Sequence, residues 1–257
     1  LMEENPHEAV HVNVFGTKII ANLAVEYGVE KFIMVSTDKA VNPTNVMGAS
    51  KRIAEMYTQC LNNKQSETQF ITTRFGNVLG SNGSVIPIFK RQIREGGPLT
   101  VTHKKVKRYF MTIPEACNLV LEAGSMGKGG EIYLFDMGEP VKIYDLACKM
   151  IKLSGLELDK DIDIEIIGLR PGEKLFEELF TDKENLIETH HPKIKKAKVE
   201  NFSNSQVSIL LDQLSNVLFA GDDYELVHVL KRLVPEYKSQ NSKFQNLDAN
   251  TELMDSA

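Results

Sequence analysis

Four polar residues follow a short apolar segment near the start of the chain and could do chemistry together. Residues 32–35 are apolar, and Ser36, Thr37, Asp38 and Lys39 come directly after them. In open α/β sheets, ligands bind outside the carboxyl ends of the strands. Hydroxyl, carboxylate and ammonium groups at such a position indicate acid–base work on a bound substrate.

A second pair of candidate residues lies on the helix that the sequence predicts over residues 47–61. Met47 and Lys51 are four positions apart, so they share one helical face. The Met47 thioether cannot carry a proton, and by itself it would be typical of core packing. By residue type alone, the adjacent Asp38 and Lys39 are likewise more typical of a salt bridge or a turn than of a catalytic pair.

Alternating strands and helices must position these residues. The sequence predicts helices over residues 6–27, 47–61, 84–94, 114–126 and 143–153, with one or two more within 205–233. Strands are expected over residues 31–36, 68–75, 131–135 and 162–167. This alternation predicts an α/β fold with a mainly parallel sheet in its first part.

The segment S-T-D-K-A-V-N-P-T-N-V-M-G-A-S-K-R, residues 36–52, resembles the extended short-chain dehydrogenase/reductase superfamily. The superfamily usually has a tyrosine in the motif Y-x-x-x-K, and this chain has Met47 at that position. In this feature the segment resembles one group of the superfamily. This group comprises the large, membrane-anchored bacterial UDP-N-acetylglucosamine 4,6-dehydratases of polysaccharide and glycan biosynthesis. The resemblance implies a bound NAD(P), with NAD slightly favoured, and a UDP-sugar substrate.

The resemblance also implies a Rossmann-like parallel sheet and a smaller carboxyl-terminal α/β region that binds substrate. No strand here is followed by a G-x-G-x-x-G turn, so we expect the amino-terminal strands of such a sheet to be missing. Residues 1–130 are expected to form the last part of the dinucleotide-binding domain. Residues 131–237 would form the substrate region with its closing helices, and residues 238–257 a disordered tail.

Four further segments resemble motifs of the same family: R-F-G-N-V-L-G at residues 74–80, G-S-V-I-P at 83–87, R-Y-F-M-T at 108–112 and L-R-P-G-E-K at 169–174. The resemblance implies cofactor contacts from Ser36, Lys51, Arg74 and Phe75. It implies substrate contacts from Asn77, Ser84, Val85, Arg108, Arg170 and Glu173. The start of the helix at Ser84 and the guanidinium of Arg108 both suit phosphate groups.

The implied reaction removes water from the sugar in three coupled steps and leaves a 4-keto-6-deoxy product. Lys51 would hold the nicotinamide ribose, and Thr37 would hydrogen-bond the oxygen on carbon 4. Asp38 is the candidate for acid–base work, including protonation of the hydroxyl that leaves carbon 6. Lys39 is the candidate base at carbon 5, which requires a pKa lowered by burial or by neighbouring cations. Met47 contributes no proton to any of these steps.

Composition narrows the other possibilities. The net charge of −5 argues against a nucleic-acid partner. No apolar run reaches the roughly 20 residues of a membrane span, so we expect this chain to be soluble. The resemblance at Met47 implies that the longer protein is anchored at the cytoplasmic side of the bacterial inner membrane. His190 and His191 lack a third ligand at useful spacing, so no metal site is predicted.

Two other functions remain open. A UDP-sugar 4-epimerase would share the fold and cofactor but would not need Asp38 and Lys39 for an elimination. A truncated, inactive chain could also serve only as a binding module, since the glycine turn and the tyrosine are both missing. The resemblance further implies a homo-oligomer, with the helices over residues 6–27 and 47–61 as its faces.

Overall fold

The computed structural model describes residues 2–65, 67–81, 83–180, 185–197, 203–219 and 222–248. Its main sheet has the order β1 (Lys31–Thr37), β2 (Gln69–Phe75), β7 (Ile132–Phe135), β11 (Ile194–Ala197) and β10 (Leu186–Glu188). Strands β1, β2 and β7 are parallel, whereas β11 and β10 add antiparallel neighbours. The predicted α/β fold with a mainly parallel sheet is therefore confirmed.

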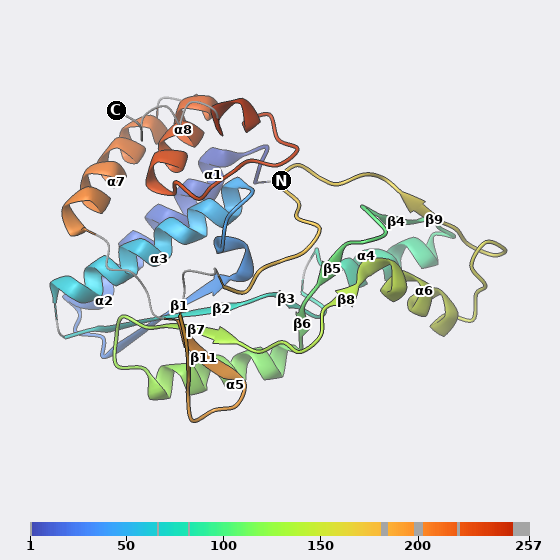
Figure 1. Cartoon of the computed structure of the whole chain (residues 1–257), viewed down its shortest axis with the longest axis horizontal. Helices are drawn as coiled ribbons and strands as arrows, with labels where there is room; N and C mark the ends of the chain where they lie inside the picture. The colour runs from blue at the N-terminus through green and yellow to red at the C-terminus, as the bar shows by residue number, and fades with distance from the viewer. Residues whose placement is uncertain are drawn as a thin grey trace.

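Helices cover both faces of this sheet (Figure 1). One face carries α1 (Pro6–Val10), η1 (His11–Gly16, a π-helix), α2 (Thr17–Glu26), α3 (Val46–Lys64), α7 (Asn204–Leu218) and α8 (Asp223–Leu233), and the other face carries α5 (Ile113–Met126). On α3, Val46, Ala49 and Ile53 recur at helical spacing and are fully buried in the core shared with α8. Among the described residues, no helix combines the length and apolar character needed to cross a membrane.

Side-chain caps fix where three of these helices begin. The side chain of Asn45 accepts a hydrogen bond from Gly48 N at 2.8 Å and so starts α3 directly after the polar segment. Thr112 caps α5 by accepting from Glu115 N, and Asp222 caps α8 in the same way. Each cap satisfies a backbone N–H that has no partner within the helix.

A second lobe projects beyond the carboxyl ends of β1 and β2 (Figure 1). It contains α4 (Val85–Arg94), β4 (Leu99–Val101), β5 (Lys107–Arg108), β8 (Val141–Lys142), α6 (Ile143–Leu153) and β9 (Ile164–Ile166) around its own apolar core. Between lobe and sheet, the short strands β3 (Asn77–Val78) and β6 (Phe110–Met111) pair in parallel. The lobe thus takes segments from both sides of residue 130, and β7 returns to the main sheet, which corrects the predicted division at that residue.

The structure also corrects the prediction of a disordered tail from residue 238. Lys231 is 1 % exposed, and its Nζ donates to Ser239 Oγ at 2.8 Å and Asp248 Oδ1 at 2.6 Å. Phe244 is fully buried in the core formed with α3 and α8. Residues 238–248 are therefore part of the packed structure, and residues 249–257 lie outside the described residues.

Candidate active site

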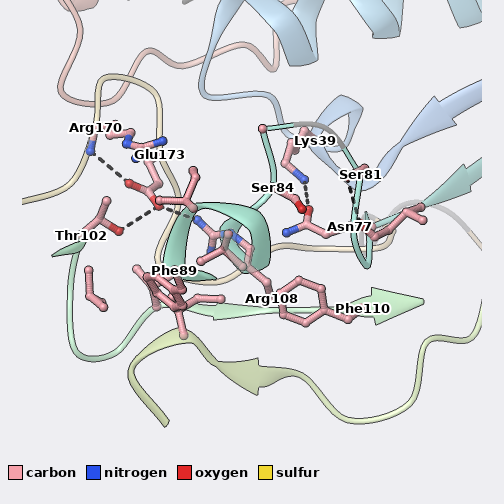
Figure 2. Close-up of a pocket in the computed structure, with 18 of the residues that line it drawn as sticks. Lys39, Asn77, Ser81, Ser84, Phe89, Thr102, Arg108, Phe110, Arg170 and Glu173 are labelled. Atoms are coloured by element: carbon pink, nitrogen blue, oxygen red, sulfur yellow. Dashed lines mark hydrogen bonds and ion pairs between the residues drawn. The ribbon is translucent and has the colours of Figure 1, made fainter. Parts of the chain in front are cut away.

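The polar residues after β1 form one hydrogen-bonded group at the edge of the sheet. Thr37 ends β1, and Asp38 and Lys39 lie in the short 3₁₀ turn η2 (Asp38–Ala40). Asp38 Oδ1 accepts from Thr37 Oγ1 at 2.9 Å and from Lys39 Nζ at 2.8 Å. Lys39 Nζ also donates to Asn77 Oδ1 at 3.0 Å (Figure 2). Asn77 comes after β2, so the carboxyl ends of two parallel neighbours supply the group.

The second oxygen of Asp38 has no hydrogen-bond partner among the described residues. Asp38 is fully buried, and an unpaired buried carboxylate oxygen is costly unless a ligand uses it. Gly76 lines the adjacent cavity, and a Cβ atom there would lie 2.9 Å from Asp38 Oδ2. The glycine therefore leaves room beside this unpaired oxygen, although Asp38 itself is not among the residues that line the cavity.

A cavity of about 720 Å³ opens beside this group, between the end of the main sheet and the second lobe (Figure 2). Its size falls within the range of small-molecule sites. Nine of the residues singled out in the sequence line it: Thr37, Lys39, Met47, Asn77, Ser84, Val85, Arg108, Arg170 and Glu173. The fold thus gathers segments that are up to 136 residues apart in the chain around one space.

Charged residues of the second lobe form another wall of the cavity (Figure 2). Arg108 Nη2 donates to Glu173 Oε1 at 3.0 Å, and Thr102 Oγ1 donates to the same oxygen at 3.0 Å. The backbone N–H of Arg170 donates to Glu173 Oε2 at 3.1 Å. Glu173 therefore holds both arginine-bearing segments in place, one through a guanidinium and the other through its backbone.

The first turn of α4 presents unused hydrogen-bonding groups to the same cavity. Ser84 precedes the helix but makes no capping hydrogen bond, and its Oγ is buried without a partner among the described residues. The first N–H groups of a helix have no intrahelical partner and carry the positive end of the helix dipole. Ser84 and Val85 thus form a site suited to an anion.

The loop that bears Arg170 and Glu173 is fastened to the start of α3. Gly172 O accepts from Thr44 Oγ1 and Asn45 Nδ2, both at 2.9 Å. Gly172 has φ +74°, and a Cβ atom there would lie 2.3 Å from Asn45 Cβ. Only a glycine permits both this backbone conformation and this close approach.

We therefore expect Gly172→Ala to weaken both the fold and the site. Overpacking and a strained φ should cost about 1–3 kcal/mol of unfolding free energy, measured by urea denaturation. Gly168→Ala is the matched control, because Gly168 also has a positive φ of +85° but no neighbour within 4 Å of an added Cβ. A loss as large for Gly168→Ala as for Gly172→Ala would contradict the role of the close approach.

Of the two residues singled out on α3, Met47 and Lys51, only the first faces the cavity. Met47 lines the cavity, whereas Lys51 lies outside it and donates from Nζ to Val35 O at 2.8 Å. Burial lowers the pKa of Lys51, and the nearby Glu55 carboxylate opposes that shift. An added Cβ at Gly48 would lie only 2.1 Å from Lys39 O, so this glycine lets α3 begin directly against the turn that holds Lys39.

The side chains of Arg74 and Phe75 make contacts inside the protein, and the cofactor role that the resemblance implies for them stays a prediction. Arg74 is 1 % exposed and forms a two-pronged ion pair with Glu55, at 2.8 and 2.7 Å. The Phe75 ring stacks on Phe135 with centroids 5.4 Å apart. Ser36 is also buried and lies outside the cavity; its cofactor contact stays a prediction.

Glu177 is the residue at this site that sequence reasoning missed. Its side chain is 4 % exposed, and its Oε1 lies 3.9 Å from Lys39 Nζ and 3.6 Å from Arg108 Nε. Burial raises the pKa of Glu177; Asp38 raises it further, against the opposing effect of Lys39 and Arg108. Glu178 beside it is half exposed, and nothing in the sequence distinguishes the two.

No three His, Cys, Asp or Glu side chains gather as metal ligands would within the part of the chain that the structure describes. His190 instead lies at the surface, where Nε2 is 2.9 Å from Glu122 Oε1.

Known proteins resemble this chain over most of its length. CapD of Staphylococcus aureus, a capsular polysaccharide biosynthesis protein, is 56 % identical over 216 residues, which cover 84 % of this chain and 36 % of CapD. A UDP-glucose 4-epimerase of Rickettsia rickettsii is 38 % identical over 181 residues, covering 70 % of this chain and 52 % of the epimerase. The chain thus spans between about a third and a half of the length of these two relatives.

Solved structures agree with the fold. Pen from Bacillus thuringiensis superposes with a TM-score of 0.70 and 36 % identity, over 82 % of this chain and 71 % of Pen. A dTDP-glucose 4,6-dehydratase from Bacillus anthracis, solved with NAD, covers 96 % of this chain and 68 % of its own. Its TM-score is 0.58 and its identity 16 %, so this likeness concerns the fold alone. The family model described as polysaccharide biosynthesis protein matches residues 1–199, and the chain belongs to that family.

Proposed function

We propose that this chain carries the sugar-facing part of a nucleotide-sugar 4,6-dehydratase, a lyase that acts on UDP-N-acetylglucosamine in polysaccharide biosynthesis. The observation that carries the proposal is the group Thr37, Asp38, Lys39 and Asn77, hydrogen-bonded together at one side of the cavity. Acid–base groups at one side and an anion site at the other match a sugar joined to a diphosphate. The capsular relative CapD supports the same biosynthetic setting.

The bound dinucleotide would supply hydride chemistry, taking hydride from sugar carbon 4 and returning it at carbon 6. The residues present suit only the nicotinamide end of that cofactor: Lys51 Nζ lies at Val35 O near the carboxyl end of β1, and no G-x-G-x-x-G turn occurs in the sequence. Burial lowers the pKa of Lys51, and hydrogen bonds from its Nζ to ribose hydroxyls would oppose that shift. We propose NAD over NADP, in keeping with the NAD in the Bacillus anthracis dehydratase.

The chain's own residues would carry the protons. Thr37 would hydrogen-bond the oxygen on carbon 4, and the free Oδ2 of Asp38 would take its proton as the ketone forms. The ketone acidifies the proton on carbon 5, which Lys39 would remove. Asp38 would then protonate the hydroxyl leaving carbon 6. Met47 lines the cavity where related enzymes have a tyrosine, and it contributes shape rather than a proton.

The UDP portion would occupy the side of the cavity formed by the second lobe. The first turn of α4 at Ser84 and Val85 would bind one phosphate through backbone N–H groups. Arg108 and Arg170 would neutralise the charge of the diphosphate. Arg108 now donates to Glu173; when it also binds the diphosphate, Glu173 would accept hydrogen bonds from the ribose hydroxyls as well.

The test is product analysis with the intact protein that contains this chain, supplied with NAD and UDP-N-acetylglucosamine. We expect a product lighter than the substrate by one water, identified by mass spectrometry as a 4-keto-6-deoxy sugar nucleotide. A product of unchanged mass would instead indicate a 4-epimerase, the alternative that the Rickettsia rickettsii relative favours. If calorimetry shows that neither UDP nor NAD binds the chain, it serves at most as an inert module.

We further propose that the longer protein is membrane-anchored on the cytoplasmic side and that the chain forms a homo-oligomer. Helix α2 exposes the apolar side chains of Ile19, Ile20 and Leu23, and Tyr27 follows them at 77 % exposure. Contiguous exposed apolar patches are typical of protein interfaces. Light scattering of the wild type and of Ile20→Glu would show whether this face joins two copies.

A further inference from the structure

Two buried carboxyl groups and two cations meet behind the cavity. Lys39 Nζ lies 2.8 Å from Asp38 Oδ1 and 3.9 Å from Glu177 Oε1, so this ammonium lies between the two carboxylates. Arg108 Nε lies 3.6 Å from the same Glu177 oxygen. Asp38 is fully buried and the Glu177 side chain is 4 % exposed, so solvent screens neither strongly.

Each of the two carboxylates has one oxygen that forms no hydrogen bond with Lys39 or Arg108. Asp38 Oδ2 and Glu177 Oε2 are buried and have no hydrogen-bond partner among the described residues. Burial raises the pKa of Glu177, and the nearby Asp38 carboxylate raises it further. Gly76, which lies against Asp38 Oδ2, lines the cavity, whereas neither Asp38 nor Glu177 is among the residues that line it. Glu177 can reach the cavity through Lys39, whose side chain lines it and whose Nζ lies 3.9 Å from Glu177 Oε1.

The proposed function leaves one difficulty at Lys39. Lys39 Nζ donates hydrogen bonds to Asp38 Oδ1 and Asn77 Oδ1. A base at carbon 5 must be the neutral amine. Some neighbouring group has to accept the proton that Lys39 gives up, and among the described residues Glu177 is the buried acceptor within 4 Å that faces no substrate.

We propose that Glu177 is a positioning residue that orients Lys39 and stores the proton Lys39 releases before it acts as the base. This rests on the proposed dehydratase function. Lys39 breaks one N–H bond and Glu177 forms one O–H bond, which converts the ammonium–carboxylate pair into amine and carboxylic acid. A rotation of the Lys39 side chain, which is 22 % exposed, closes the 3.9 Å gap to a hydrogen bond.

Protons and electrons also balance in the steps that follow, the loss of water and the reduction of carbon 6. The Lys39 amine takes the proton from carbon 5, and the electrons of that C–H bond form the double bond to carbon 6. The C6–O bond breaks, and the hydroxyl leaves as water with the proton that Asp38 gained from the oxygen on carbon 4. Lys39 returns its proton to carbon 5 as hydride arrives at carbon 6, and Glu177 then returns the stored proton to Lys39.

The charged groups around Glu177 set the pKa at which it can hold the proton. Burial raises the pKa of Glu177 and the Asp38 carboxylate raises it further, whereas Lys39, Arg108 and Lys174 act in the opposite direction. Carboxyl ¹³C NMR titration of the chain, assigned by comparison with Glu177→Gln, measures this directly. We expect Glu177 to titrate above the ordinary range of glutamate, higher still in Lys39→Met and lower in Asp38→Asn. An ordinary titration that ignores Lys39 would overturn proton storage, whether or not the protein is active.

The kinetic test compares Glu177→Gln with the matched control Glu178→Gln in the intact protein. We expect Glu177→Gln to lower kcat at least ~10-fold, a part of the roughly 10²–10⁴-fold that acid–base catalysis supplies. KM should stay within about threefold, because Glu177 does not line the cavity. The deficit should narrow as pH rises, since bulk hydroxide then deprotonates Lys39, and Glu177→Asp should restore part of kcat.

The outcomes separate the two proposals. A wild type that releases no water from the sugar nucleotide overturns the dehydratase itself. A wild type that dehydrates while Glu177→Gln keeps normal kcat overturns the role of Glu177 alone. A deficit that is the same at every pH also overturns proton storage, because a purely structural contact to Lys39 and Arg108 would give that result.

Discussion

Asp38→Asn and Lys39→Met should each lower kcat for sugar dehydration by about 10²–10⁴-fold, the usual contribution of a general acid or base. The amide introduced by Asp38→Asn would keep the hydrogen bond from Thr37 but could neither accept nor release a proton. The thioether introduced by Lys39→Met would fill the space of the lysine stem without an amine, so the proton on carbon 5 would have no acceptor. Stopped assays that quantify the 4-keto product would measure both effects.

The affinity for UDP provides the internal control for these two variants. The anion site at Ser84 and the guanidinium of Arg108 belong to other segments than Asp38 and Lys39, so calorimetric UDP affinity should stay within about twofold. Lys152→Met, at an exposed position of α6 in the second lobe, is the matched control for loss of a lysine. Near-normal turnover in both Asp38→Asn and Lys39→Met would refute the assignment of the acid and base.

The main features of the cavity could be predicted because they depend on local order along the chain. Thr37 ends one parallel strand and Asn77 follows its neighbour, and the carboxyl ends of neighbouring parallel strands must meet at one edge of the sheet. The helix expected from residue 47 begins at Val46, and the cap at Asn45 that fixes this start was not part of the prediction. Where a residue's position follows from strand order, the sequence was enough.

The contacts that the sequence analysis did not anticipate are those that depend on the three-dimensional arrangement of the chain. Arg74 and Phe75 are adjacent in β2 and so point to opposite faces of the sheet, one towards Glu55 on α3 and the other towards Phe135. Treating residues 74–80 as one ligand-binding motif does not take into account that successive side chains of a strand point to opposite faces. Glu177 lies 138 residues from Lys39 in the chain, and no local pattern marks a contact over that separation. Its burial follows from the docking of the loop at Gly172 against α3.

Breaking the ion pair between Arg74 and Glu55 should have the largest effect on stability. Both side chains are almost fully buried, at 1 % and 0 % exposure, and they join β2 to α3 through two hydrogen bonds. Removing one partner of such a pair leaves a buried charge uncompensated, which costs about 3–5 kcal/mol. We therefore expect Arg74→Met to lower the unfolding free energy by that amount, with a smaller loss if Arg52, 3.1 Å from Glu55, takes over part of the pairing.

Two comparisons show whether the charge pair itself is responsible. Glu157→Gln breaks an ion pair of 2.9 Å between side chains that are each 68 % exposed, and such surface pairs contribute little. It should leave the unfolding free energy nearly unchanged. The double variant Glu55→Gln with Arg74→Met removes both charges, and it should be more stable than Arg74→Met alone, because no unpaired charge remains. A double variant no more stable than Arg74→Met would mean that packing, not charge, accounts for the loss.

The pH dependence of stability gives an independent measure of the same pair. Burial alone would raise the pKa of Glu55, but Arg74, with help from Arg52, outweighs burial and holds it at about 2, below the ordinary value of 4.5. A carboxyl whose pKa is lower in the folded state stabilises the fold above its unfolded-state pKa, and that contribution is lost as pH falls towards the folded value. Urea denaturation of the wild type should therefore lose stability between about pH 4.5 and 2. Glu55→Gln cannot titrate, so its stability should fall less steeply over this range; an equal slope would show that other carboxyl groups cause the acid sensitivity.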